Sequence, residues 1–261
     1  MITGFDLFAP GAGDALVLTG TRVTGLMLVA PSLSSMVVPH RVRAGLVVVL
    51  TILLTPAAFA VQRLPHLTGI AFASELLIGF ALGFGASVLV GAAEQAGDAM
   101  AVQMGLSGIA ILDPMAAEPV PVIGSFLQLF AVTLLLSLKL HTVMIATMAE
   151  SLRAIPLGSA PGLANGIHEL LMLGTTMFAL GVRFAAPVIA VILIVNVSLA
   201  VMGRAAPQLN VLSVAFPMQI AMGLFALAAA IPAMGVFFGG WDSVYHGMVS
   251  RAVGGFTFTG R

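Results

Sequence analysis

The sequence predicts an all-α protein whose hydrophobic helices lie in a membrane or against other subunits. Hydrophobic residues make up 60% of the 261 residues and charged residues only 8%, whereas soluble domains carry about 25% charged residues. Several apolar stretches reach the roughly 20 residues that an α-helix needs to cross the hydrocarbon core. A strand in that position would leave its backbone groups unpaired in lipid, so helix is the expected form.

Six apolar segments follow one another along the chain, and each is a predicted helix. Their approximate bounds are 15–30, 44–61, 67–93, 122–149, 170–202 and 211–240. The polar connections are 31–43, 62–66, 94–121, 150–169 and 203–210, and a tail over 246–261 is predicted to be disordered. Lysine and arginine divide three against four between the two sides of a six-span arrangement, so the positive-inside rule assigns no orientation. A long apolar helix can instead be buried against a partner subunit.

Ionisable residues interrupt most of these segments. The first contains Arg22, the third Glu75, the fourth Lys139 and the fifth Arg183, and Arg204 follows the fifth. A charged group is costly in hydrocarbon and usually faces a partner or water. The sequence does not indicate which groups pair, so structural ion pairs and snorkelling at helix ends are favoured over a proton relay.

The third predicted helix carries a small residue at every fourth position, namely Gly79, Gly83, Ser87 and Gly91. Small side chains let two helix backbones approach closely. A four-residue step drifts by about 40° per repeat on an α-helix, so the neighbouring helix should cross at an angle. Packing within the chain is the simpler interpretation, and a contact between subunits is the alternative.

Glu94 and Asp98 follow the third segment at a spacing of four residues. This spacing puts both carboxylates on one helical face, where like charges oppose helix formation unless the face is wet. We interpret them as a solvated rim. The alternative is that they, or Glu75, couple ion movement in a secondary transporter or channel. Such transporters carry paired internal repeats, and the sequence contains no convincing repeat.

The segment 105–118 is apolar yet broken by glycine and proline. Its central residues are Gly105, Leu106, Ser107, Gly108, Ile109, Ala110, Ile111, Leu112, Asp113, Pro114 and Met115. Glycine permits positive φ and proline ends helices, so a structured loop is predicted. Irregular backbone cannot face lipid, and the loop should be buried in protein or line a cavity. Met100, Met104 and Met115 cluster around it, and soft thioethers adapt to varied partners. They are gasket candidates, with ordinary gap-filling as the alternative.

The sequence offers no signal of catalysis. Ten basic and ten acidic residues give zero formal charge, so nucleic acid is not an expected partner. Cysteine is absent, which excludes thiol chemistry and iron–sulfur clusters. The chain contains no phosphate-binding loop, no His-Glu-x-x-His and no Gly-x-Ser-x-Gly elbow. We therefore expect no catalytic residue, no metal site and no cofactor.

Long motifs occur in order along the chain. The first runs from Ala96-Gly97-Asp98 through Gln103-Met-Gly-Leu-Ser107 to Asp113-Pro114, and the second is Asn196-Val-Ser-Leu-Ala-Val-Met-Gly-Arg-Ala-Ala-Pro-Gln208, followed by Phe216-Pro217. The first connection carries Pro31, Val38-Pro39 and Arg41-Val-Arg43. In these motifs, and in segment order over residues 10–245, the chain resembles the FliR family of flagellar biosynthetic proteins, whose injectisome counterpart is the T-type export component. The motif residues are Arg41, Arg43, Gln103, Arg204, Pro207, Gln208 and Pro217.

The resemblance implies a P-like helical part, residues 1–165, fused to a Q-like two-helix hairpin, residues 166–245. It implies a closed export gate in which the chain joins P-type and Q-type subunits (FliP-like and FliQ-like). Further implied partners are FlhB-like and FlhA-like components, the basal-body MS ring, unfolded protein substrates and membrane lipid. The implied location is the flagellar basal body in the bacterial inner membrane. The loop 105–118 would correspond to the family's central plug, so the implied mechanism is gating.

Overall fold

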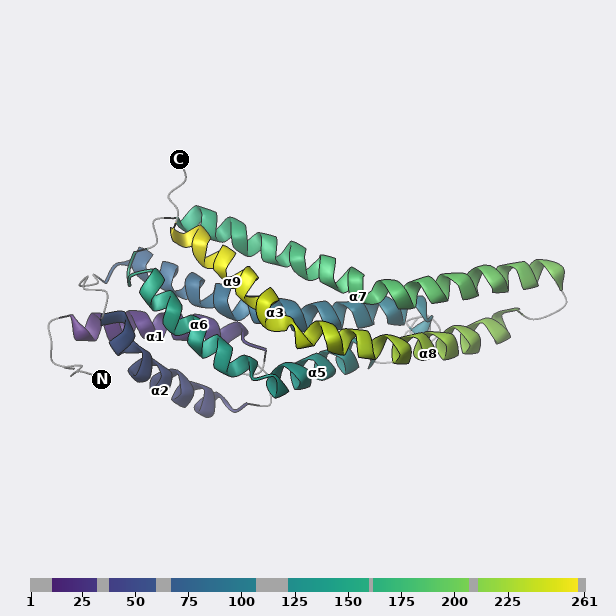
Figure 1. The fold of residues 1–261 in the computed structure, drawn as a ribbon, viewed down its shortest axis with the longest axis horizontal. Helices are drawn as coiled ribbons and strands as arrows, with labels where there is room; N and C mark the ends of the chain where they lie inside the picture. Colours follow the sequence, from purple (N-terminus) through teal and green to yellow (C-terminus); the bar gives the residue numbers. More distant parts are fainter. Residues whose placement is uncertain are drawn as a thin grey trace, which may run out of the picture. The chain divides into compact units, whose positions relative to one another are not determined.

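The computed structural model describes residues 11–31, 38–59, 67–106, 122–159, 162–206 and 211–257, and all the secondary structure in these ranges is helical (Figure 1). This confirms the all-α prediction. The helices are α1 (Ala12–Val29), α2 (His40–Phe59), α3 (Gly69–Gln103), α5 (Val122–Ser137), α6 (Leu140–Ala154), α7 (Leu163–Ala205), α8 (Val211–Gly239) and α9 (Trp241–Thr257).

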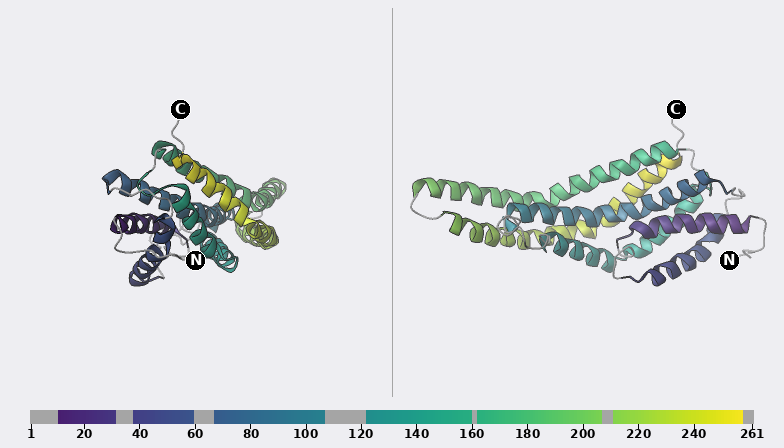
Figure 2. Two further views of the ribbon diagram at one scale, coloured as in Figure 1. Left: turned by 60° about the vertical axis from the view of Figure 1, so that its left-hand side comes forward. Right: turned by 180° about the vertical axis from the view of Figure 1, so that it is seen from behind.

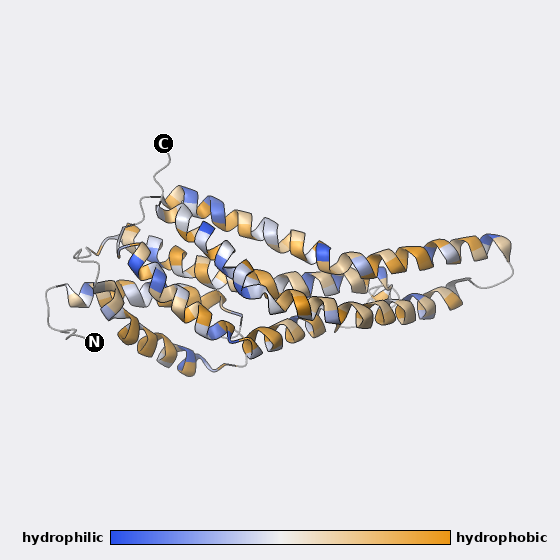
Figure 3. Cartoon of the chain, in the orientation of Figure 1, coloured by the Kyte–Doolittle hydropathy of each residue, from blue (hydrophilic) through white to orange (hydrophobic). Residues whose placement is uncertain are grey.

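Five of these helices, α1, α2, α3, α7 and α8, are long and apolar enough to cross a membrane. Apolar residues predominate along them (Figure 3). Helices α5 and α6 could form a sixth span, but they are bent by 68° at the break between them. Lys139 lies in that break with a φ of 63°, so the predicted fourth segment is two helices. The lengths and compositions agree with a helical membrane protein.

The chain forms two compact units. Unit 1 comprises Met1–Val88, Leu136–Thr175 and Trp241–Arg261, and unit 2 comprises Leu89–Leu135 and Thr176–Gly240. Helices α3 and α7 contribute residues to both. The predicted division at residues 165 and 166 therefore does not coincide with the boundary of either unit. Within unit 1, α1 and α2 lie side by side in both views of Figure 2.

The stripe of small residues packs against α1 inside unit 1. A Cβ atom on Gly79 would collide with the carbonyl oxygen of Arg22, and one on Gly83 would lie 2.6 Å from that of Leu26. The Ser87 hydroxyl donates a hydrogen bond to the carbonyl oxygen of Val29 at 2.5 Å. Over these positions the stripe is a contact within the chain. Gly91, in unit 2, faces the side chain of Met177 instead.

Arg22 and Glu75 form a fully buried ion pair in unit 1. The guanidinium donates from Nε to Oε2 at 2.5 Å and from Nη2 to Oε1 at 3.1 Å. It also donates to the carbonyl oxygens of Ser151 at 2.9 Å and Ile155 at 3.2 Å. The carboxylate accepts the N–H of Gly158 at 2.9 Å. Both charges are thus paired and hydrogen-bonded, which a buried ion pair requires.

Two predicted connections are shorter than expected. Helix α3 continues to Gln103 and includes Glu94 and Asp98, because residues 96–103 include three alanines and a methionine, which favour helix. Helix α6 continues to Ala154 and α7 begins at Leu163. Residues 94–103, 150–154 and 163–169 therefore lie on helices. The connections predicted at 94–121 and 150–169 are wrong for these residues.

The prediction of a disordered tail over 246–261 is wrong for the residues up to Thr257, which belong to α9. One face of α9 is buried, at Trp241, Tyr245, Met248, Val249, Ala252 and Phe256. The Tyr245 hydroxyl donates to the carbonyl oxygen of Leu82 at 3.2 Å. Burial raises the pKa of Tyr245 to about 12, so the hydroxyl stays protonated and keeps this bond.

Candidate functional site at the end of helix α3

Helix α3 ends in unit 2 at the glycine where the predicted loop begins. The last helical residue is Gln103, and Gly105 follows with a φ of 77°. Its N–H donates to the carbonyl oxygen of Val102 at 3.1 Å. Glycine adopts this left-handed conformation without the penalty that a Cβ imposes. Of the loop, Gly105 and Leu106 are described; residues 107–115 lie outside the described residues.

The end of α3 rests on the first turns of α8. A Cβ atom on Gly105 would lie 3.1 Å from the Phe216 ring and 3.2 Å from Oε1 of Gln219. One turn further along α8, a Cβ atom on Gly223 would lie 2.6 Å from the Met104 side chain. A glycine on each side therefore lets α3 and α8 approach closely.

The same turns of α8 are tied to α7. The Gln219 amide donates a hydrogen bond to the Asn196 side chain at 2.6 Å. Asn196 begins the second long motif, Phe216 belongs to the Phe216-Pro217 pair that follows it, and Gly105 belongs to the first motif. Residues from these three stretches of sequence thus meet at one place, although up to 111 positions separate them.

Two of the three gasket candidates lie among the described residues. Met100 and Met104 are fully buried within the chain, where Met104 fills the space left by Gly223. Met104 therefore fills a gap within the chain. Met115 lies outside the described residues.

A polar contact joins α3 to α5 in unit 2. The Gln128 amide donates to the Glu94 carboxylate at 2.7 Å. A Cβ atom on Gly97 would lie 2.7 Å from the Cα of Gly124, and one on Gly124 would collide with the Asp98 carboxylate. Oδ1 of Asp98 is buried and has no hydrogen-bond partner among the described residues. Glu94 and Asp98 are therefore half-buried against α5.

Sequence reasoning missed several residues of the site, namely Gly124, Gln128, Gln219 and Gly223. The glycines carried a usable signal, because a glycine inside an apolar helix costs about 1 kcal/mol relative to alanine and often marks a close contact. The two glutamines carried none.

The other motif residues that the structure describes do not join this site. Arg41 and Arg43 lie in the first turn of α2, in unit 1. Arg204 is exposed in the last turn of α7, where a cation complements the helix dipole. Pro217 is exposed on α8. Pro207 and Gln208 lie outside the described residues.

The described residues form long apolar helices, and a buried ion pair joins two of them. These features are those of an all-helical membrane protein. No group of three histidine, aspartate or glutamate residues is placed to hold a metal ion in the part of the chain that the structure describes.

Comparison with known proteins assigns the family. The family described as "Bacterial export proteins, family 1" matches residues 14–241. The flagellar biosynthetic protein FliR of Escherichia coli (strain K12) is 31% identical over 219 residues, 83% of this chain and 84% of that protein. FliR of Aquifex aeolicus (strain VF5) is 29% identical over 227 residues, 83% and 85% of the two chains, and FliR of Bacillus subtilis (strain 168) is 27% identical over 230 residues, 85% and 86%. The chain belongs to the FliR family of bacterial export proteins.

This family confirms the resemblance drawn from the motifs. The relatives are named as flagellar biosynthetic proteins, and the family is described by protein export. The family assignment and the apolar helices together identify the chain as a membrane component of flagellar protein export.

Proposed function

We propose that the chain is a structural subunit of the flagellar export gate in the bacterial inner membrane, and that its loop 105–118 plugs the pore for unfolded proteins. The observation that carries the proposal is the base of the loop. The loop starts at Gly105, whose positive φ allows a sharp change of direction. That glycine is held between Phe216 and Gln219 of α8.

A plug needs a fixed base and a movable end. The Gln219–Asn196 hydrogen bond ties the part of α8 next to Gly105 to α7, and buried Met104 packs against the following turn of α8. Beyond Gly105 the sequence is apolar and interrupted by Gly108 and Pro114. An apolar constriction excludes water and ions by dewetting, and an arriving chain would displace it by rotation at the glycines. The energy for export would come from other components.

Assembly with P-type and Q-type subunits accounts for the exposed apolar surface. Only 28% of the most apolar window of α7 and 22% of that of α8 is buried within the chain. Side chains such as Phe225, 71% exposed, and Val236, 80% exposed, need lipid or protein against them. The α7–α8 pair is the Q-like hairpin of the proposal, and FlhB-like and FlhA-like components and the MS ring would surround the gate in the basal body.

Two of the three carboxylates that an ion-coupled transporter would use are already engaged within the chain. Glu75 is neutralised by Arg22 and accepts a further backbone N–H. Glu94 accepts a hydrogen bond from Gln128.

Deletion of residues 107–115 tests the plug, because it removes most of the loop 105–118 and keeps the contacts of Met104 and Gly105. We expect the assembled complex to form and to leak small solutes when reconstituted in vesicles, measured by efflux of an entrapped dye. A complex that lacks only residues 258–261 serves as the matched control and should stay tight. An assembled deletion complex as tight as this control would refute the plug.

A further inference from the structure

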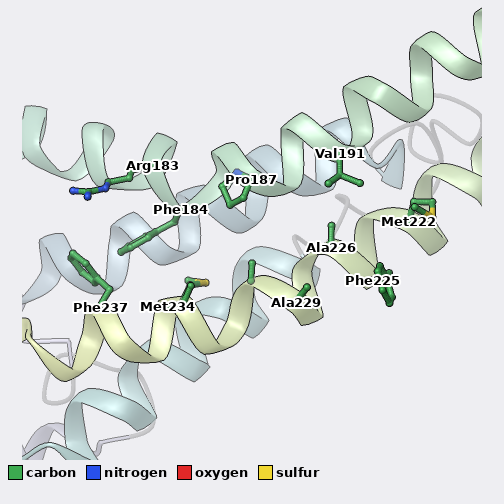
Figure 4. A pocket seen from close by; sticks show the side chains of 12 residues that line it. Arg183, Phe184, Pro187, Val191, Met222, Phe225, Ala226, Ala229, Met234 and Phe237 are labelled. Carbon is green, nitrogen blue, oxygen red and sulfur yellow. The ribbon is translucent and has the colours of Figure 1, made fainter.

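A groove with apolar walls lies between α7 and α8 in unit 2 (Figure 4). Its volume is about 670 Å³. The two helices touch near the ends of the groove, where the Phe184 and Phe237 rings are 4.8 Å apart and where Gln219 bonds Asn196 at 2.6 Å. Between these contacts α8 presents small side chains, including Ala226, so the helices leave a space between them.

Arg183 is the one ionisable residue among those that line the groove. Its side chain is exposed and makes no hydrogen bond or ion pair with any described residue. In Figure 4 it stands near Phe184 and Phe237, at the end of the groove opposite Met222. A guanidinium beside an apolar groove attracts an anion that carries an apolar tail.

The position of Arg183 along α7 matches the edge of a hydrocarbon layer. Residues 184–203 contain no ionisable side chain, and Arg204 follows them. These 20 residues span about 30 Å at 1.5 Å per residue, which is the thickness of the hydrocarbon core. In an α7 that spans the bilayer, the two arginines would lie at the two edges of this core, next to the lipid phosphates.

We propose that the groove holds an acyl chain of an anionic phospholipid whose phosphate binds Arg183. The groove runs past Pro187 and Ala229 to Met222, and the 15 positions from Phe237 to Met222 cover about 22 Å of helix. A third helix, 10–12 Å across, does not fit between helices that touch at both contacts, whereas an acyl chain does. This lipid site does not depend on the plug.

Photolabelling tests the site in the assembled complex that contains the full chain. The complex is reconstituted in phosphatidylcholine vesicles in which either phosphatidylglycerol or phosphatidylcholine carries a diazirine on its acyl chain. After illumination, labelled peptides are identified by mass spectrometry. We expect phosphatidylglycerol to label the groove residues of α7 and α8 more strongly than phosphatidylcholine does.

Substitutions separate the headgroup from the chain. Arg183→Gln should lower phosphatidylglycerol labelling about fivefold, the effect of one cation near an anionic lipid, and Arg183→Lys should retain most of it. Ala229→Phe should lower labelling by both lipids, because it fills the groove. Arg251→Gln, an exposed arginine on α9, and Ala228→Phe, next to the groove residue but outside the lining, are the matched controls and should label like the wild type.

Two results would overturn the proposal. One is that the two lipids label the groove equally and that Arg183→Gln changes the labelling by neither. The other is an absence of lipid adducts in the groove while a photo-crosslinking amino acid at Ala229 captures a neighbouring subunit, which would assign the groove to protein.

Discussion

Helix α3 makes close glycine contacts in both units, but the contacts differ in what opposes the glycine. In unit 1, Gly79 and Gly83 face backbone carbonyl oxygens of α1. At its end in unit 2, α3 meets α8 through Gly105 and Gly223, which face the side chains of Phe216, Gln219 and Met104. Backbone cannot move without shifting a helix, whereas a side chain can change rotamer. The α1–α3 crossing is therefore rigid, and the α3–α8 contact can adapt.

The largest effect should come from the buried ion pair that fixes the rigid crossing. Glu75→Ala leaves the Arg22 guanidinium buried without its counter-ion, and we expect the unfolding free energy to fall by about 3–5 kcal/mol. Denaturant titration of the detergent-solubilised chain, followed by circular dichroism, measures it. The double variant Arg22→Met with Glu75→Leu should recover much of the loss, because it removes both charges together. No recovery would mean that the hydrogen bonds to α6 matter more than the pair.

Gly79→Ala tests the crossing directly. The new methyl group would meet the carbonyl oxygen of Arg22, and overpacking of this kind costs about 1–3 kcal/mol. The same titration measures it. Gly174→Ala on α7 is the matched control, because a Cβ atom there meets nothing within 4 Å and alanine favours helix by up to about 1 kcal/mol. Equal stabilities of the two variants would show that α1 can shift away from α3.

Gly223→Ala makes the same change at the adaptable contact, and it should have the smallest effect. Met104 opposes the new methyl group, but its unbranched side chain can move aside. We expect a loss below about 1 kcal/mol, partly offset by the helix preference of alanine. If Gly223→Ala destabilises the chain as much as Gly79→Ala does, the distinction between the two contacts fails.

The sequence predicted the helices well because runs such as 44–61 and 211–240 are too long and apolar for any other form. It missed the last turns of α3, because the charged Asp98 was interpreted as part of a polar connection. It also missed α9, because the glycines near 254 were interpreted as a tail although Tyr245, Met248 and Ala252 have helical spacing. Gly105 could be predicted as the start of a loop from residue type alone. The partners Arg22 and Glu75 could not be matched, because 53 positions separate them and their meeting depends on how two helices cross.

Unit 1 draws its residues from both ends of the chain. Arg22 near the start binds carbonyl oxygens at 151 and 155, and the N–H of Gly162 donates to the carbonyl oxygen of Phe256 at 3.0 Å. During translation, which adds about 5–20 residues per second from the N-terminus, Arg22 emerges long before those acceptors. Until α6 has been synthesised, the Arg22 guanidinium lacks its two carbonyl acceptors. The core of unit 1 closes only when α9 leaves the ribosome, so a chain stalled before Trp241 is a natural target for quality-control proteases.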